Sequence, residues 1–170
     1  MDTRTLYKLK TLLIQNQLKI AVAESLSCGH LQAALGSLSG SSAFFEGGIT
    51  AYSLQQKIRL LNVDPQHAKA VNCVSQTVAD EMAMGICRLF QTDIGLATTG
   101  YAEPAPENIA APLAFFAICQ CRNGQIMKIA GGQIDGSKLN RIDMQKRVSN
   151  TVINRLLTAM EFGEIRRRRY

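Results

Sequence analysis

The sequence predicts an α/β fold, a three-layer α/β/α sandwich around a mixed sheet. Two observations lead to this class. Helical patterns alternate with short apolar strands over roughly the first hundred residues, and a hairpin signal at Asn123 and Gly124 then precedes a long final helix. Alternation requires crossover connections, which make strands parallel and place helices on both faces of a sheet. An Asn-Gly turn joins antiparallel strands, so the sheet is expected to be mixed.

The first elements are a helix, a strand and a second helix. Leucines at helical spacing predict an amphipathic helix over residues 3–15. Residues 19–23 form a short apolar strand, and Ser25 lies at the turn that follows it. A helix is expected after Ser25, and a loop rich in glycine and serine occupies residues 36–42.

The second strand is expected over Ile49–Tyr52. Gly47 and Gly48 come directly before it, at a place where the backbone can pass very close to another group. Ser53 is a suitable N-cap for the helix that follows. Tyr52 would then lie at the carboxyl end of a strand, and Lys57 would face back toward it from the first helical turns.

The middle of the chain predicts a helical turn over residues 65–70, because proline suits the first position of a helix. Ser75 opens a longer helix with an apolar face that includes Leu89 and ends near Phe90. Residues 93–98 form a buried strand that leads into Thr99 and Gly100.

The last third begins with a proline-rich loop over residues 102–112, a length that often borders a site in a compact domain. Strands are expected over residues 113–121 and 125–129, and a helix over residues 137–160. The inward residues of that helix are predicted to be Ile142, Val148, Val152, Leu156 and Leu157.

Composition favours a single domain over residues 1–163 with a basic tail over residues 164–170. The chain has 170 residues, and 46% of them are hydrophobic, as expected for a compact globular protein. Its net charge is +6, but Arg166 to Arg169 carry four of these charges, which leaves about +2. That remainder is too small for an electrostatic footprint, so no nucleic-acid partner is expected.

The sequence also bears on location and on metal binding. It has no apolar run of 18 residues, and its start lacks the apolar segment of a signal peptide, which predicts a cytoplasmic protein without a membrane span. Five cysteines without a regular framework are expected to be reduced. No second cysteine pair has zinc spacing, so neither a structural metal nor a cofactor is predicted.

Three predicted strand ends carry polar side chains: Ser25, Tyr52 and Thr99. Strands that end at one edge of an open α/β sheet bring such residues together, and ligands bind there. Tyr52 and Lys57 alone prove little, because a rim aromatic and a solvated lysine would give the same pattern. Ser25, in a second stretch that runs from strand to turn to helix, favours a site.

The stretch GSSAFFEGGITAYSLQQKIRLLNV, followed by VSQTVADEMAMG, resembles the C-terminal domain of the CinA family, the competence/damage-inducible proteins. The resemblance covers almost the whole chain, and stand-alone members of this family include nicotinamide-nucleotide amidases. It implies hydrolysis of the carboxamide of nicotinamide mononucleotide, a small-molecule nucleotide, to nicotinate mononucleotide and ammonia. This would be a recycling step in pyridine nucleotide metabolism. The resemblance also implies a homodimer.

Carried onto this chain, the resemblance makes Ser25, Tyr52 and Lys57 catalytic. Ser25 would attack the carboxamide carbon, and Lys57 would be the base if burial lowered its pKa. Tyr52 would relay the proton or hold the lysine. Backbone N–H groups of residues 27–29 would bind the oxyanion or an anionic group. The residues expected to bind substrate are Ser27, Gly29, Gly48, Thr99, Gly100 and Arg141, of which the arginine would suit a phosphate.

The chain departs from the family pattern around this set. The family usually has Cys-Thr-Gly-Gly after its serine, where this chain has Leu26 to Gly29 with Cys28 at the first glycine. Glu103 adds a negative charge near the expected ligand. Further on, Ala114 and Phe115 replace a Gly-Thr pair, and Gln145 stands at a second basic position.

These changes keep an alternative open: a catalytically impaired relative that binds a nucleotide or a protein partner. Each candidate residue also has a simpler interpretation. Ser25 could cap the following helix, Glu24 could hold local backbone, His30 could be a surface residue, and Arg141 could be a solvated helix arginine.

Overall fold

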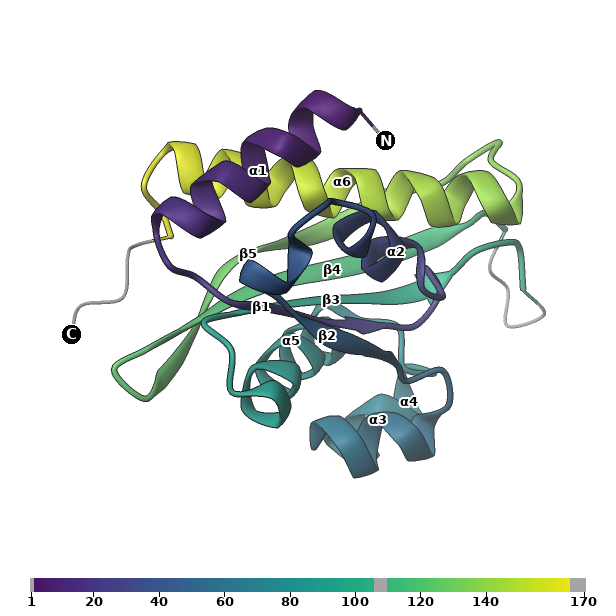
Figure 1. The fold of residues 1–170 in the computed structure, drawn as a ribbon. Coiled ribbons are helices and arrows are strands. Elements are labelled where there is room, and N and C mark those ends of the chain that lie inside the picture. The colour runs from purple at the N-terminus through teal and green to yellow at the C-terminus, as the bar shows by residue number, and fades with distance from the viewer. Residues whose placement is uncertain (1, 106–109, 166–170) are drawn as a thin grey trace.

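The computed structural model describes residues 2–105 and 110–165 and contains one five-stranded mixed sheet (Figure 1). The strand order is β2-β1-β3-β4-β5. Strand β1 pairs in parallel with both β2 and β3, whereas β4 and β5 extend the sheet in antiparallel fashion. The strands are β1 (Ile20–Glu24), β2 (Phe45–Thr50), β3 (Ile94–Tyr101), β4 (Leu113–Arg122) and β5 (Gln125–Asp135).

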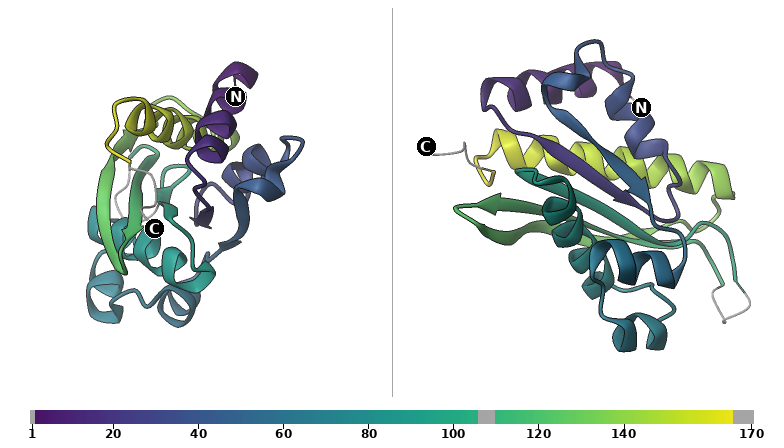
Figure 2. Two further views of the ribbon diagram at one scale, coloured as in Figure 1. Left: turned by 60° about the vertical axis from the view of Figure 1, so that its left-hand side comes forward. Right: turned by 60° about the horizontal axis from the view of Figure 1, so that its bottom comes forward.

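Helices cover both faces of the sheet, so the predicted α/β/α sandwich around a mixed sheet is confirmed (Figures 1 and 2). One face carries α1 (Thr3–Gln15), α2 (His30–Gly36) and α6 (Arg141–Glu161). The other carries α3 (Leu54–Leu61), α4 (Pro65–Ala70) and α5 (Gln76–Phe90). A short 3-10 helix, Ser41–Ala43, precedes β2.

The central strand β1 divides the core in two. Its five residues are all fully buried, with Ile20 and Val22 in the cluster under α1 and α6, and Ala21 and Ala23 in the cluster under α5. Small residues on the α5 side let that helix lie close to the sheet. A Cβ added at Gly95 would lie 2.2 Å from a main-chain oxygen of α5, so glycine is needed there.

Polar side chains begin the helices where the sequence predicts them. Ser53 accepts the N–H of Gln56, which confirms the predicted cap, and Ser75, where a helix was predicted to open, accepts the N–H of Val78 as the N-cap of α5. The predicted turn over residues 65–70 is α4, with Pro65 in its first turn. These local signals are reliable because a side-chain acceptor satisfies N–H groups that have no partner inside the helix.

The second strand lies earlier in the chain than predicted. Strand β2 begins at Phe45 and ends at Thr50, so Gly47 and Gly48 are inside it and Tyr52 is two residues past its end. Packing explains the glycine at position 48, because an added Cβ would lie 2.6 Å from the carbonyl oxygen of Val22. The glycine pair was predicted to precede the strand. It instead lies inside β2, where that strand pairs with β1.

Other boundaries also differ from the prediction. Strand β5 continues to Asp135, and the last helix begins at Arg141 after the cap Asn140 instead of at residue 137. Ile142 and Leu89 were predicted to face the core, but they are 50% and 48% exposed. Both lie in a terminal turn of their helix.

At the other end of α6, Glu164 bonds to Arg155 and the side chain of Ile165 is buried. The four arginines of the predicted basic tail lie outside the described residues. Within the described part of the chain, no helix is long and apolar enough to cross a membrane.

Candidate functional site

Ser25 follows β1 directly and is only 7% exposed. It does not cap α2, whose N-cap position is Gly29. The carboxylate of Glu24 takes this role, since it accepts the main-chain N–H groups of Gly29, Leu31 and Gln32 at 2.8–3.2 Å. Glu24 therefore holds local backbone, as one interpretation of the sequence expected, and it leaves the hydroxyl of Ser25 available for another partner.

That partner is Lys57, which reaches Ser25 from α3. The lysine is 1% exposed, and its Nζ lies 3.0 Å from Ser25 Oγ. The same nitrogen donates to the main-chain oxygens of Ala51 and Tyr52 at 2.8 and 3.0 Å. The sequence prediction that Lys57 faces back toward the strand ends is confirmed by these contacts.

Burial of Lys57 changes its acid–base behaviour. Desolvation lowers the pKa of the amine below its ordinary value, and the neighbouring thiol of Cys73 opposes this shift in part. A neutral amine has two N–H donors and one lone pair. When the two donors satisfy the carbonyls of Ala51 and Tyr52, the lone pair is left for the hydroxyl proton of Ser25.

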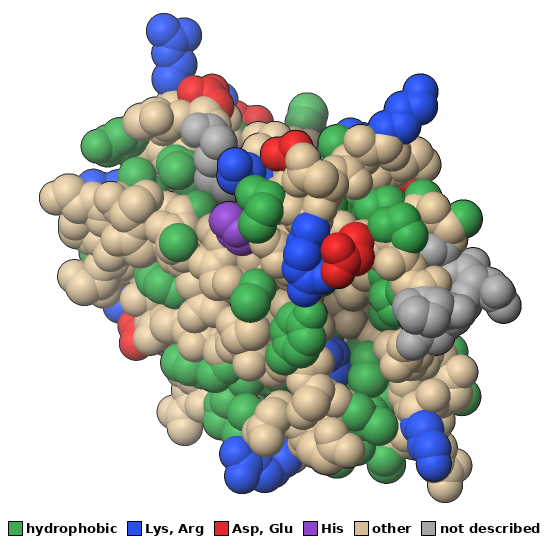
Figure 3. Space-filling view, turned by 90° about the vertical axis from the view of Figure 1, so that its right-hand side faces the viewer, with side chains coloured by type: hydrophobic (Ala, Val, Ile, Leu, Met, Phe, Trp, Pro, Cys, Tyr) green, Lys and Arg blue, Asp and Glu red, His purple; other side chains and the backbone are tan. Residues whose placement is uncertain are grey.

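These groups open into a cavity of about 290 Å³ at the edge where the parallel strands end. Figure 3 shows this face of the molecule, on which a basic and an acidic side chain stand next to each other near the middle. The described residues that line the cavity are Ser25, Tyr52, Ser53, Leu54, Lys57, Asn72, Cys73, Val74, Thr99, Gly100 and Tyr101. The structure thus brings together Ser25, Tyr52, Lys57, Thr99 and Gly100 of the predicted set.

Thr99 and Gly100 shape the floor of the cavity. The Thr99 hydroxyl donates to the main-chain oxygen of Cys73 at 2.6 Å. Gly100 has a φ of 150°, and an added Cβ would lie 2.3 Å from the carbonyl oxygen of Leu113 and 2.6 Å from the Cα of Ala114. Ala114 is therefore a close packing partner of Gly100 across the β3–β4 ladder.

Tyr52 contacts Lys57 through its backbone, not through its ring. Its side chain is 56% exposed, and its hydroxyl accepts a bond of 2.9 Å from the guanidinium of Arg141. Arg141 also donates to Glu103 at 2.5 Å. The hydrogen bond that Arg141 donates to Tyr52, together with the charge of Glu103, raises the pKa of Arg141. The main-chain carbonyl of Tyr52 therefore holds Lys57, whereas the phenol of Tyr52 bonds to Arg141 at the mouth of the cavity.

Several residues predicted to bind substrate do not line this cavity. The Ser27 hydroxyl is buried against Thr98 at 2.7 Å and joins the turn to β3. Among the predicted oxyanion donors, the N–H of Cys28 bonds to the oxygen of Ser25, and the N–H of Gly29 bonds to Glu24. Ser27 is fully buried, and none of residues 27–29 is among the described residues that line the cavity. The packing of Gly48 against β1 accounts for that glycine without a ligand.

The other residues at changed positions also have structural places. Phe115 is half-buried and pairs with Thr99 across the β3–β4 ladder. Gln145 is buried on α6. Neither lines the cavity among the described residues.

Sequence reasoning missed the wall made by Asn72, Cys73 and Val74. Asn72 and Cys73 have φ values of 47° and 61°, so two successive non-glycine residues adopt the left-handed conformation. The Asn72 amide donates to the hydroxyl of Tyr101 at 2.8 Å, which fixes this turn to the end of β3. Asn72 was the available signal, because asparagine tolerates this conformation better than most residues.

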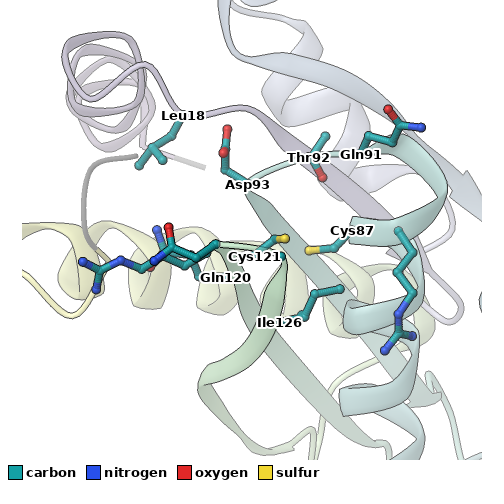
Figure 4. A pocket seen from close by; sticks show the side chains of 12 residues that line it. Leu18, Cys87, Gln91, Thr92, Asp93, Gln120, Cys121 and Ile126 are labelled. Atoms are coloured by element: carbon teal, nitrogen blue, oxygen red, sulfur yellow. The ribbon is translucent and has the colours of Figure 1, made fainter. Parts of the chain in front are cut away.

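A larger cavity, of about 690 Å³, lies at the opposite end of the sheet between α5 and the β4–β5 hairpin (Figure 4). Cys87 and Cys121 point toward each other in its wall. Burial raises the pKa of Cys87 to about 12, which makes it a poor nucleophile at neutral pH. Asp93 accepts the N–H of Lys19, and Thr92 donates to a main-chain oxygen, so these polar groups have structural roles.

Metal ligands do not gather in the part of the chain that the structure describes. No group of three or more His, Cys, Asp and Glu side chains in residues 2–105 and 110–165 could hold a metal ion. Of the two histidines, His67 bonds through Nε2 to the hydroxyl of the helix cap Ser75 at 3.0 Å.

Solved structures share this fold. A CinA superfamily protein from Klebsiella pneumoniae aligns over 94% of this chain and 97% of its own, with a TM-score of 0.84 and 24% identity. A competence or damage-inducible protein from Enterobacter asburiae aligns over 92% and 96%, with a TM-score of 0.83 and 26% identity. At these identities the match concerns the architecture first.

Sequence comparison gives closer relatives. A putative competence-damage inducible protein of Alkaliphilus oremlandii is 37% identical over 131 residues, 77% of this chain but only 31% of its own length. A CinA-like protein of Chlorobium limicola is 40% identical over 126 residues, 74% of this chain and 27% of its own. The chain thus spans about a third of the length of these relatives.

Protein MG115 of Mycoplasma genitalium is nearer in size. It is 45% identical over 103 residues, which cover 60% of this chain and 66% of that protein. The sequence profile of the CinA C-terminal domain matches residues 3–160, from α1 to the end of α6. The chain belongs to the CinA C-terminal domain family.

Proposed function

We propose that this protein is an amidase that hydrolyses the carboxamide of nicotinamide mononucleotide to nicotinate mononucleotide and ammonia. One observation carries this function: the buried Nζ of Lys57 lies 3.0 Å from Ser25 Oγ at the wall of a cavity. A serine beside an amine of lowered pKa is a nucleophile with its base, which is what metal-free amide hydrolysis needs. The family resemblance supplies the substrate.

In the first half of the reaction, the lone pair of Lys57 takes the proton of the Ser25 hydroxyl as Oγ attacks the carboxamide carbon. The tetrahedral intermediate then collapses, and the ammonium of Lys57 returns the proton to the departing nitrogen, which leaves as ammonia. An ester between Ser25 and the nicotinoyl group remains. The carbonyls of Ala51 and Tyr52 keep the amine aimed at Ser25 throughout.

In the second half, a water molecule gives a proton to Lys57 and attacks the ester carbon. Collapse of this intermediate breaks the bond to Ser25 Oγ, which recovers its proton from Lys57. The products are the free carboxylic acid and the original side chains.

A homodimer, a cytoplasmic location and a nucleotide substrate belong to this same proposal. They come from the family resemblance and from the sequence, and the names of the relatives say only that those proteins are CinA-like or competence-damage inducible.

A second candidate is a relative of low activity that binds a nucleotide or a protein partner. The contact between Arg141 and Glu103 favours it, because the phosphate of a mononucleotide would have to compete with the Glu103 carboxylate for the guanidinium.

Ammonia release from nicotinamide mononucleotide by the purified protein separates the two candidates. The amidase should turn over, and Ser25→Ala should abolish turnover in a folded protein. Cys121→Ser, at the larger cavity, is the matched control and should keep full activity. An inert wild-type protein that still binds the nucleotide would favour the second candidate.

A further inference from the structure

Three side chains from distant parts of the chain meet at the mouth of the site. Tyr52 follows β2, Glu103 follows β3, and Arg141 is the first residue of α6. The guanidinium donates through one terminal nitrogen to Glu103 at 2.5 Å and through the other to the Tyr52 hydroxyl at 2.9 Å. Tyr52 itself lines the cavity, so this group of three borders the space where a substrate would bind.

Both terminal nitrogens of the guanidinium are therefore engaged. An arginine recognises a phosphate best by presenting two parallel N–H donors to two oxygens. A phosphate at this position would have to displace the carboxylate of Glu103 or lie beside its negative charge. The side chains of Arg141 and Glu103 are 41% and 56% exposed, so their ion pair is weak enough for a phosphate to displace Glu103. The displacement still costs the free energy of that ion pair.

The remaining lining offers little positive charge to compensate. The lysine of the lining, Lys57, is 1% exposed, and its Nζ already bonds to Ser25 and to the carbonyls of Ala51 and Tyr52. The other polar residues of the lining carry hydroxyl or amide groups. Among the described lining residues, no arginine or second lysine faces the cavity.

We infer that Glu103 determines specificity: by holding Arg141, it makes the site select carboxamides that carry no anionic group over their phosphorylated counterparts. For the amide chemistry this rests on the proposed function. It concerns which amide is preferred, so nicotinamide mononucleotide would still be hydrolysed, but with a lower kcat/KM than the corresponding riboside. Nicotinamide riboside has the same ring, sugar and carboxamide as the mononucleotide but lacks its phosphate, so it carries no anionic group.

Binding to the Ser25→Ala protein, measured by calorimetry, tests this without hydrolysis. The two ligands are nicotinamide riboside and nicotinamide mononucleotide, which differ only by the phosphate. The riboside should bind more tightly than the mononucleotide. Adding Glu103→Gln, which keeps the shape and removes the charge, should strengthen mononucleotide binding about two- to five-fold, the range of an exposed ion pair, and leave the riboside unchanged.

Two further variants show whether the effect is local. Arg141→Gln combined with Glu103→Gln should remove the gain, because no guanidinium is left to receive the phosphate. Glu46→Gln, which breaks a comparably exposed ion pair with Lys19 at 2.8 Å on another part of the surface, should change neither affinity.

The inference is overturned if the mononucleotide binds more tightly than the riboside and Glu103→Gln changes nothing, or if neither ligand binds. The proposed function fails separately, through absence of ammonia release from both amides. An inert protein with the expected binding pattern would keep Glu103 as the specificity determinant and remove the amidase. An active amidase that is indifferent to Glu103→Gln would do the reverse.

Discussion

A cavity lies at each end of the sheet, and the smaller of the two has the side chains better suited to catalysis. The amino end holds a cavity of about 690 Å³, and the carboxyl end holds one of about 290 Å³. Yet it is the smaller cavity whose described lining includes a buried lysine, Lys57, bonded to the hydroxyl of Ser25. At the larger one, the buried thiol of Cys87 has its pKa raised to about 12.

On the proposed function, this difference teaches that a buried ionisable side chain indicates the site better than cavity volume does. Burying an amine is costly unless hydrogen bonds hold it, and Lys57 has three, of which two are to main-chain carbonyls. No packing requirement explains a lysine there, because an apolar side chain would fill the same space at lower cost. An expensive side chain held in a cavity wall is therefore a mark of function.

The largest contrast between the two ends should come from Ser25→Ala. We expect a loss in kcat/KM on the order of 10³-fold or more, as for the nucleophile of other serine hydrolases. Ammonia release is the measurement, with circular dichroism to confirm folding. Equal losses in Ser25→Ala and in Cys121→Ser would break the comparison, since Cys121 lines the other cavity.

Next in size is the pair Lys57→Met and Lys57→Arg. A missing general base costs about 10²- to 10⁴-fold, and arginine cannot act as a base because it stays protonated. Both variants should lose activity to this extent, although Lys57→Arg keeps the positive charge. Substantial turnover by Lys57→Arg would show that charge near Ser25, not proton transfer, is what the site uses.

The pH dependence of stability should also distinguish Lys57 from a surface lysine. Its pKa is lowered in the folded state, so between that value and 10.5 the unfolded chain binds a proton that the folded chain does not. The free energy of unfolding of the wild type, relative to Lys57→Met, should therefore rise with pH across this window. Urea denaturation at a series of pH values measures it, and a pH-independent difference would contradict the lowered pKa.

The smallest effects come from two buried threonines at opposite ends of β3. Thr99 donates to the oxygen of Cys73 at 2.6 Å, and Thr92 donates to the oxygen of Ile94 at 3.1 Å. Changing either to valine leaves a carbonyl without its donor and should cost about 1 to 3 kcal/mol of unfolding free energy. Only Thr99→Val should also lower kcat/KM, because Thr99 lines the site. Equal kinetic effects would mean that general destabilisation accounts for both.

Much of the fold was predictable because its signals are local. Caps such as Ser53 and Ser75, and the short helix at Pro65, depend on a few neighbouring residues. The boundaries of β2 were not predictable in this way. Gly48 packs against the carbonyl of Val22 on the neighbouring strand, and Gly47 packs against the ring of Phe90 in α5, and a local sequence pattern reports neither contact.

The candidate site likewise has a part that local patterns predicted and a part that they did not. Ser25, Tyr52 and Thr99 were predicted together because strand ends converge at one edge of a parallel sheet, and Lys57 was expected to face back toward them from the next helix. The phenol of Tyr52 was expected at Lys57 but bonds to Arg141, a residue 89 positions away. The wall formed by Cys73 depends on a left-handed turn without glycine, for which Asn72 is the one local signal in the sequence.

The most direct test of the central claim is the pKa of Lys57 itself. Carbon-13 NMR of protein labelled at lysine Cε can follow each amine through its titration, and Lys57→Arg assigns the signal that disappears. We expect Lys57 to titrate below 10.5, with its neutral form available to accept the proton of Ser25. A midpoint at or above 10.5 would mean that the amine stays charged beside the hydroxyl, and Lys57 could not then be the base.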